Sequence, residues 1–400
     1  MDPTRHVKPA VRAVAAYTLA AREAPVKLNQ NENPWDVPES LKRRVLEKAL
    51  SRPWSRYPDF DPRELVEALA RFSGWRADGI LAGNGSNELI AALLMVTAGP
   101  GTRVVVPEPT FTLYAHLTRI LGGEPVRVRL LPARHPARGA RRGGRAADAP
   151  AAAPDGGLVS DEDEAPGVAY DVGALLAARR DSGATVTIVC SPNNPTGTSL
   201  TLPEVERLCR DGDSLVVIDE AYHEFAGETV VPLLEEHPNL VVLRTFSKAM
   251  ALAGLRVGYL LASPELVREV DKARLPYNLN FFSQLAALAA LEDEGALAEA
   301  VGRLAAERER LLALLGDVPG VRAWPSRANF FLLELLAASP RAVFESLHRR
   351  GVLVRDVTSY PTLSRCLRVS VGTPGESEEL VRALGTALGE AGVDFTTGRA

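Results

Sequence analysis

The chain has 400 residues, of which 46% are hydrophobic, 24% charged and 6% aromatic. This composition excludes a chain that is disordered throughout, and the length suits two or three domains that each bury a core. With 46 basic against 50 acidic residues and a net charge of -4, we expect no overall attraction to nucleic acid or to an anionic membrane.

Cysteine and histidine usage predicts neither a disulfide nor a metal site. Cys190, Cys209 and Cys366 are widely spaced and form no CxxC motif, and the six histidines form no pair at metal-ligand spacing. We therefore expect buried free thiols, no metal, and the reducing cytoplasm as the compartment. Neither a signal-peptide core nor a run of about 20 apolar residues is found in the sequence.

Short β-branched runs alternate with helical patterns over most of the chain. They predict strands at 103–106, 126–128, 185–190, 215–218, 240–244 and 257–261. These runs are nearly all apolar, which is typical of a mostly parallel sheet covered by helices on both faces. Ligands of such α/β sheets bind beyond the carboxyl ends of the strands.

Residues 133–167 differ from their surroundings. The segment is rich in Ala, Gly, Pro and Arg in its first half, and it is acidic at 161–164. Because it offers almost no large apolar side chain, we predict a flexible, solvated surface insertion without an assigned function.

Beyond residue 276 the pattern changes. It predicts one long helix at 284–315, followed by short strands at 329–334, 352–355 and 367–371. This order is typical of a second, smaller α+β domain.

A small-residue turn at 83–88 precedes a predicted helix at 89–96. Free backbone N–H groups at such a helix start can bind an anion, although a simple helix cap has the same pattern. The turn is no dinucleotide fingerprint, because Glu88 stands at the place of the third glycine.

Two further strand ends carry polar side chains. Asn194, between prolines at 191–197, can donate a hydrogen bond to a phenolate-type oxygen, or it can simply belong to a turn. Asp219 ends a predicted buried strand, where a carboxylate needs a cationic partner or strong donors. A protonated pyridine nitrogen is one such partner, and a helix cap is the alternative interpretation.

The last of these polar segments is 245–248, which follows the predicted strand 240–244, together with Arg256. Lys248 can form a Schiff base with an aldehyde, while the hydroxyls of Thr245 and Ser247 can bind a phosphate together with Arg256. Each segment alone also fits an ordinary turn or surface residue. Together, at successive strand ends, they indicate a phosphate-bearing aldehyde cofactor.

With these residues the sequence resembles the fold-type I pyridoxal-phosphate aminotransferases, and more narrowly the histidinol-phosphate aminotransferases. The resemblance spans nearly the whole chain except 133–167, and it rests on strings at 27–34, 56–59, 85–88, 191–197, 219–222, 245–248, 253–259 and 367–373. It implies a large domain with a mostly parallel seven-stranded sheet at 29–275, a small domain at 276–400, and an N-terminal arm at 1–28.

The resemblance also implies a role for individual residues. Lys248 would carry pyridoxal 5'-phosphate as a Schiff base and move protons, with Asp219 and Tyr222 as further catalytic residues. The residues implied to bind the cofactor are Tyr57, Gly85, Ser86, Asn87, Phe111, Asn194, Asp219, Tyr222, Thr245, Ser247, Lys248 and Arg256. Those implied to bind substrate are Tyr17, Asn194, Arg355 and Arg368.

The implied reaction exchanges an amino group between L-histidinol phosphate and 2-oxoglutarate in histidine biosynthesis. The implied assembly is a homodimer in which Tyr57 reaches the cofactor phosphate of the partner subunit. An aromatic-amino-acid aminotransferase and a threonine-phosphate decarboxylase share much of the pattern. A cofactor-sensing transcription regulator has the same kind of fold, but no basic helix-turn-helix pattern precedes residue 29.

Overall fold

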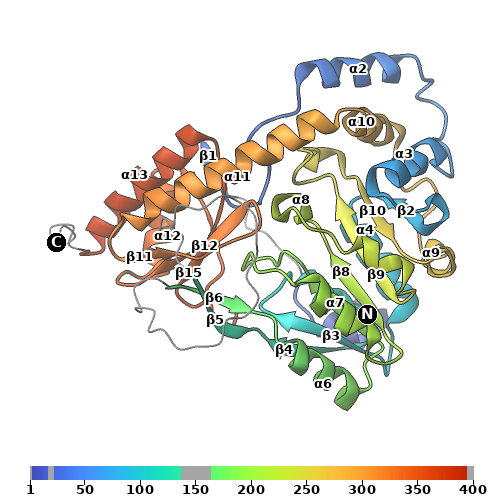
Figure 1. The fold of residues 1–400 in the computed structure, drawn as a ribbon, viewed down its shortest axis with the longest axis horizontal. Helices are drawn as coiled ribbons and strands as arrows, with labels where there is room; N and C mark the ends of the chain where they lie inside the picture. Colours follow the sequence, from blue (N-terminus) through green and yellow to red (C-terminus); the bar gives the residue numbers. More distant parts are fainter. Residues whose placement is uncertain (1, 17–21, 137–163, 394–400) are drawn as a thin grey trace.

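The computed structural model describes residues 2–16, 22–136 and 164–393. Its centre is a seven-stranded sheet with the strand order β2-β10-β9-β8-β7-β3-β4 (Figure 1). All neighbours pair in parallel except β10, which is antiparallel to both β2 and β9. The strands are β2 (Ile80–Gly83), β3 (Arg103–Glu108), β4 (Glu124–Arg129), β7 (Val186–Cys190), β8 (Leu215–Asp219), β9 (Leu240–Thr245) and β10 (Gly258–Leu261).

Alternate side chains of each strand enter two separate cores. Val105 and Ile218 pack in one core with α3 (Arg63–Ser73), α6 (Val172–Ser182) and α7 (Leu202–Arg210). Val104 and Val217 pack in the other with α4 (Ser86–Thr97), α5 (Leu113–Leu121) and α9 (Pro264–Asp271). Helices thus cover both faces of the sheet, which explains why its strands are apolar throughout. The predicted α/β class is confirmed.

A second, four-stranded sheet of order β11-β12-β15-β14 lies apart from the first (Figure 1). It consists of β11 (Val321–Ala323), β12 (Phe330–Leu335), β14 (Arg355–Asp356) and β15 (Cys366–Ser370), and it packs with α11 (Glu294–Gly316), α12 (Pro340–Arg349) and α13 (Pro374–Glu390). Beside it, β1 (Val26–Lys27) pairs in parallel with β13 (Val352–Leu353). The domain limits given above stay a prediction.

Two sequence-based expectations need correction, and one strand of the large sheet was missed. The helix predicted at 284–315 is two helices, α10 (Phe281–Leu291) and α11, because Asp293 leaves the helical conformation and caps α11 by accepting a hydrogen bond from the Ala296 N–H. The strand predicted at 352–355 is divided between β13 and β14. The short edge strand β2 was not predicted, because four residues carry little periodic signal.

The ends of the predicted insertion form regular structure. β5 (Leu131–Pro136) pairs with β6 (Glu164–Ala169) in an antiparallel two-stranded sheet. The central part of the predicted insertion, 137–163, lies outside the described residues.

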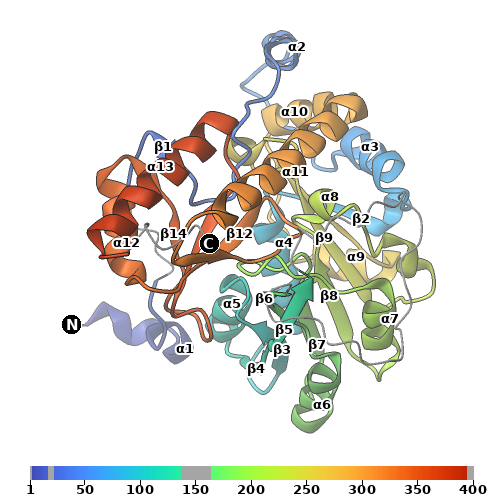
Figure 2. The same ribbon diagram turned by 60° about the vertical axis from the view of Figure 1, so that its left-hand side comes forward.

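The remaining elements lie around the large sheet. The helix α2 (Glu39–Leu50) stands out from the body beside α10 (Figure 1), and α1 (Pro9–Arg12) lies near α5 (Figure 2). Shorter pieces are η1 (Pro3–His6), η2 (Ala77–Gly79), α8 (His223–Ala226), η4 (Val231–Glu235) and η5 (Ala253–Leu255). Within the described residues, no helix has the length and apolar character needed to cross a membrane.

Candidate active site

A cavity of about 400 Å³ lies where the carboxyl ends of the large-sheet strands face the small sheet. Side chains that are far apart in sequence meet here, as the rule for open α/β sheets predicts. Of the predicted site residues, the cavity is lined by Ser86, Asn87, Phe111, Asn194, Asp219, Tyr222, Thr245, Ser247, Lys248, Arg256, Arg355 and Arg368.

One end of this cavity is built for an anion. The helix α4 begins at Ser86 after Gly85, whose φ of +77° favours glycine. Arg256 donates a hydrogen bond to the Ser247 hydroxyl at 3.3 Å, and the Thr245 hydroxyl donates to the same oxygen at 3.0 Å. A Cβ atom at Gly85 would lie 2.6 Å from Nη2 of Arg256. The turn therefore requires glycine to let the guanidinium approach the helix N-terminus, where N–H groups and positive charge suit a phosphate.

Lys248 lines the same cavity. Its ammonium Nζ donates a hydrogen bond to the backbone oxygen of Gln30 at 3.0 Å. The pKa of Lys248 is lowered from 10.5 to about 8, mainly by burial and in addition by the positive charge of Arg368. The neutral amine is the form that attacks an aldehyde and accepts a proton, so the site favours the reactive form of this side chain.

Asp219 ends β8 with only 3% of its surface exposed. It accepts hydrogen bonds from the Tyr114 hydroxyl at 2.6 Å and from the Ala221 N–H at 3.1 Å. Burial nevertheless raises the pKa of Asp219 to about 6, and none of the groups that contribute to this shift is a cation. The carboxylate would gain a matching charge from a protonated pyridine nitrogen, which is the group that the sequence predicted for it.

Tyr222 and Asn194 line the cavity, and each is held by a hydrogen bond. The Asn31 amide donates to the Tyr222 hydroxyl at 3.1 Å, and Arg368 donates to the Asn194 side-chain oxygen at 2.6 Å. Because that oxygen accepts from Arg368, the amide nitrogen of Asn194 is the group left to donate to a ligand. Burial raises the pKa of Tyr222, which keeps its hydroxyl protonated and able to donate.

Two arginines come from the small-domain strands. Arg368 in β15 is buried and also donates to the backbone oxygen of Asn29 at 2.6 Å, while Arg355 in β14 is half-buried at the cavity wall. Together with the helix terminus at Ser86, the cavity holds an anion cradle, a lysine of lowered pKa, a buried carboxylate and two further cationic groups. This donor set fits a phosphorylated pyridine aldehyde and a second, anionic ligand.

Two predicted residues lie elsewhere. Tyr17 is outside the described residues. Tyr57 lies away from the cavity, 80% exposed, with its ring stacked on Tyr277 at 4.5 Å between centroids. Sequence reasoning assigned no role to Tyr114, although it follows Phe111 by one helical turn, nor to Asn31 within the 27–34 string.

Comparison with known proteins indicates the same kind of chemistry as the residues that line this cavity. The family model "Aminotransferase class I and II" matches residues 23–139 and 159–384. The chain belongs to the class I and II aminotransferases. It is a transferase that depends on pyridoxal phosphate, and the predicted family and cofactor are confirmed.

Within this family, several of the similar proteins carry the name histidinol-phosphate aminotransferase. The chain is 36% identical to "Histidinol-phosphate aminotransferase" from Chlorobium phaeovibrioides, with 96% of this chain and 97% of the relative covered. It is also 36% identical to the protein of that name from Chlorobaculum tepidum, covering 94% and 99%. The histidinol-phosphate aminotransferase from Sinorhizobium meliloti, solved in complex with pyridoxal-5'-phosphate, has a TM-score of 0.79 and 25% identity, covering 96% and 98%.

Proposed function

We propose that this aminotransferase moves the amino group between L-histidinol phosphate and 2-oxoglutarate, giving imidazole-acetol phosphate and L-glutamate. Relatives that are 36% identical over nearly their whole length and carry that name support this assignment. The main structural support is that Arg355, Arg368 and Lys248 line the same cavity.

Pyridoxal phosphate, when bound, supplies an electron sink for the bond to the substrate Cα. Lys248 would hold the cofactor through its Nζ, and its free amine would accept the proton from the substrate Cα and return it at the cofactor carbon C4'. Its pKa of about 8 suits both steps, because the amine can accept a proton near neutral pH and give it back.

Asp219 would hold the proton on the pyridine nitrogen, and its bonds to Tyr114 and Ala221 fix the carboxylate in place. The Asn194 amide and the Tyr222 hydroxyl would donate to the ring oxygen. Phe111 lines the same cavity, and its ring can stack on the cofactor without offering a hydroxyl.

The N-terminus of α4 would hold the phosphate group of the cofactor. Its oxygens would be bound by the backbone of Ser86 and Asn87 after Gly85, the hydroxyls of Thr245 and Ser247, and the guanidinium of Arg256. The close approach of Arg256 to Gly85 supports this assignment.

The substrates bring two different anions to the same site. L-glutamate has an α-carboxylate and L-histidinol phosphate has none, so one pocket must accept both. Arg368, held rigidly by Asn194 and Asn29, suits the carboxylate, and Arg355 at the rim of the cavity suits the phosphate. Tyr17 stays a predicted contact to substrate.

We also propose a homodimer with shared sites in a reducing, cytoplasmic compartment. The face of α2 and the segment after it expose apolar side chains, among them Leu50 at 77%, Trp54 at 71% and Tyr57 at 80%. The partner subunit would cover them, and Tyr57 would reach the partner's cofactor phosphate. All three cysteines are free and buried, which agrees with a reducing compartment.

The dimer can be tested by mixing two inactive variants, Lys248→Ala and Tyr57→Ala. A mixed dimer contains one site with both native residues, so we expect activity to return after subunit exchange. A monomer by light scattering, or no recovery in a mixture that has exchanged, would contradict shared sites.

The substrate is tested by mixing the holoenzyme with L-histidinol phosphate alone and following the visible absorption of the bound cofactor. We expect conversion at far lower concentration than with L-phenylalanine or L-threonine phosphate, and none in Lys248→Ala. Conversion only with L-phenylalanine would identify an aromatic aminotransferase. Release of carbon dioxide from L-threonine phosphate without 2-oxoglutarate would identify a decarboxylase.

A further inference from the structure

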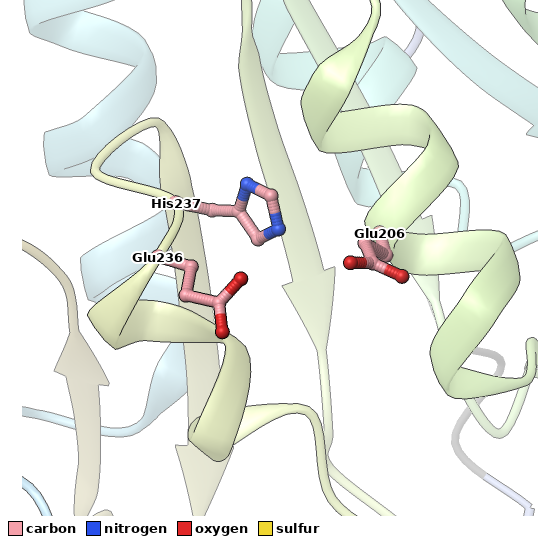
Figure 3. A group of neighbouring side chains, drawn as sticks. All are labelled: Glu206, Glu236 and His237. Atoms are coloured by element: carbon pink, nitrogen blue, oxygen red, sulfur yellow. The ribbon is translucent and has the colours of Figure 1, made fainter.

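A second group of chemistry-bearing side chains lies near the amino ends of β8 and β9, remote from the cavity. Glu206 belongs to α7, and Glu236 and His237 directly follow η4 (Figure 3). One ligand atom from each of the three side chains lies within 4.8 Å of the other two. Among the residues that the structure describes, no other group of at least three His, Cys, Asp or Glu side chains is placed to hold a metal.

His237 distinguishes this group from an ordinary acidic surface. Its exposed fraction is only 7%, and its Nε2 has no hydrogen-bond partner among the described residues. The ring edge points toward Glu206 (Figure 3). A buried polar atom left without a partner destabilises the folded state. A cation bound to the lone pair of Nε2 would remove that destabilisation.

The backbone that holds these side chains is fixed without any metal. The His237 N–H donates to Leu233 and its carbonyl accepts from Leu240, each at 3.0 Å. The Asn239 amide donates to the backbone oxygens of Cys209 at 3.0 Å and Ser214 at 2.9 Å. The start of β9 is thereby tied to the end of α7 and to the residue before β8, so the ligand-bearing segments are already positioned.

The donor set selects the type of ion. One imidazole nitrogen and two carboxylates suit Zn²⁺, whereas Mg²⁺ and Ca²⁺ prefer oxygen ligands alone. A tetrahedral zinc site, with bonds of about 2.0–2.2 Å, places ligand atoms roughly 3.4 Å apart. Rotation of the glutamate side chains, of which Glu236 is exposed and Glu206 half-buried, can shorten the distances between the ligand atoms.

Arg210 is the neighbouring charge that competes with a metal. Its guanidinium lies 2.6 Å from one carboxylate oxygen of Glu206, and its side chain is 65% exposed. Such an exposed pair is weak, and the second oxygen of Glu206 stays available as a ligand.

We propose that Glu206, Glu236 and His237 bind one Zn²⁺ ion, with water as the remaining ligand, as a clip between α7 and the start of β9. Because none of the three lines the cavity, the clip stabilises the large sheet and takes no part in amino transfer. Binding to the folded state alone raises thermal stability by mass action.

The test uses holoenzyme without an affinity tag, freed of metal with a chelator and titrated with zinc chloride in a calorimeter. We expect one zinc per chain. His237→Gln and Glu206→Gln should each weaken binding by roughly tenfold or more, since each removes one of three protein ligands. Glu235→Gln, which removes a neighbouring exposed carboxylate outside the group, should bind as the parent does.

A second readout separates a lost ligand from a damaged fold. Zinc should raise the thermal unfolding midpoint of the parent and of Glu235→Gln but not of the other two variants, and all should keep the visible absorption of bound cofactor. Glu206 is 32% exposed, so its substitution is compatible with folding. The proposal would be overturned if the parent took up no zinc. It would also be overturned if Glu206→Gln and His237→Gln took up zinc as tightly as the parent does.

Discussion

Asp219 and Glu220 are neighbours at the end of β8, both almost completely buried, yet they lie in opposite surroundings. Glu220 forms an ion pair with Arg244 at 3.0 Å and accepts from the Thr229 hydroxyl at 2.9 Å and the Val230 N–H at 2.6 Å. Asp219 accepts two hydrogen bonds and contacts no cation that lowers its pKa.

The difference teaches which of two buried carboxylates is structural. A buried charge that is already paired has its requirements met by the protein itself, whereas one without a cation awaits a charged ligand. Glu220 thus joins β8 to β9 on one face of the sheet, and Asp219 faces the cavity on the other. Three predictions test this contrast, and a fourth tests the lowered pKa of Lys248.

The largest expected effect is the loss of stability when Glu220 loses its cationic partner. Arg244→Leu leaves a buried carboxylate without its cation, so we expect the free energy of unfolding to fall by about 3–5 kcal/mol, measured by chemical denaturation. Arg268→Leu, which breaks an exposed pair with Glu265, is the control and should leave the unfolding midpoint unchanged. Should Arg244→Leu not fold, the double variant Arg244→Met with Glu220→Gln should recover stability. A native midpoint in Arg244→Leu would refute the structural role.

Substitution of Asp219 should lower the activity without lowering the stability of the fold. Asp219→Asn keeps the shape and the acceptor for Tyr114 but loses the charge, so we expect kcat to fall roughly a hundredfold or more. The unfolding midpoint of the cofactor-free protein should stay the same or rise, because an unpaired buried charge is removed. Glu220→Gln is the matched control, with native kcat per folded molecule. Native kcat in Asp219→Asn would remove Asp219 from the mechanism.

Tyr114 should have a smaller effect, through Asp219. Its hydroxyl lowers the pKa of that carboxyl by donating to it, so Tyr114→Phe should raise this pKa and move the acid limb of the kcat profile to higher pH. We expect kcat at neutral pH to fall by roughly tenfold or less. Phe225→Leu, in the same core, should alter stability without moving the pH profile. An unmoved profile in Tyr114→Phe would show that the hydrogen bond only packs the core.

The smallest effect concerns the lowered pKa of Lys248. Since only the neutral amine reacts with an aldehyde, the rate at which cofactor-free protein takes up pyridoxal phosphate should rise with pH around a midpoint near 8. An exposed lysine in a model peptide, with a pKa near 10.4, should show its rise about two units higher. A midpoint near 10 in the protein would contradict a buried amine.

Much of the fold could be read from the sequence because it is encoded locally. The β-branched runs of the strands that end at Cys190, Asp219 and Thr245 predicted parallel strands. Polar residues at the carboxyl ends of such strands share one edge of the sheet. The break at Asp293 was missed, because the Ala- and Leu-rich pattern continues through it. The roles of the gathered side chains stay predictions.

By itself, the sequence determined the α/β class, since apolar periodicity needs no knowledge of distant contacts. The resemblance carried by its motifs indicated the family and most of the predicted residues that line the cavity. Tertiary structure alone decided which charges are paired. It placed Arg244 on Glu220 and Tyr114 on Asp219, and it brought His237 to Glu206 from a separate element. Such partners depend on which face of a strand or helix a side chain occupies after packing, and sequence spacing carries no record of that.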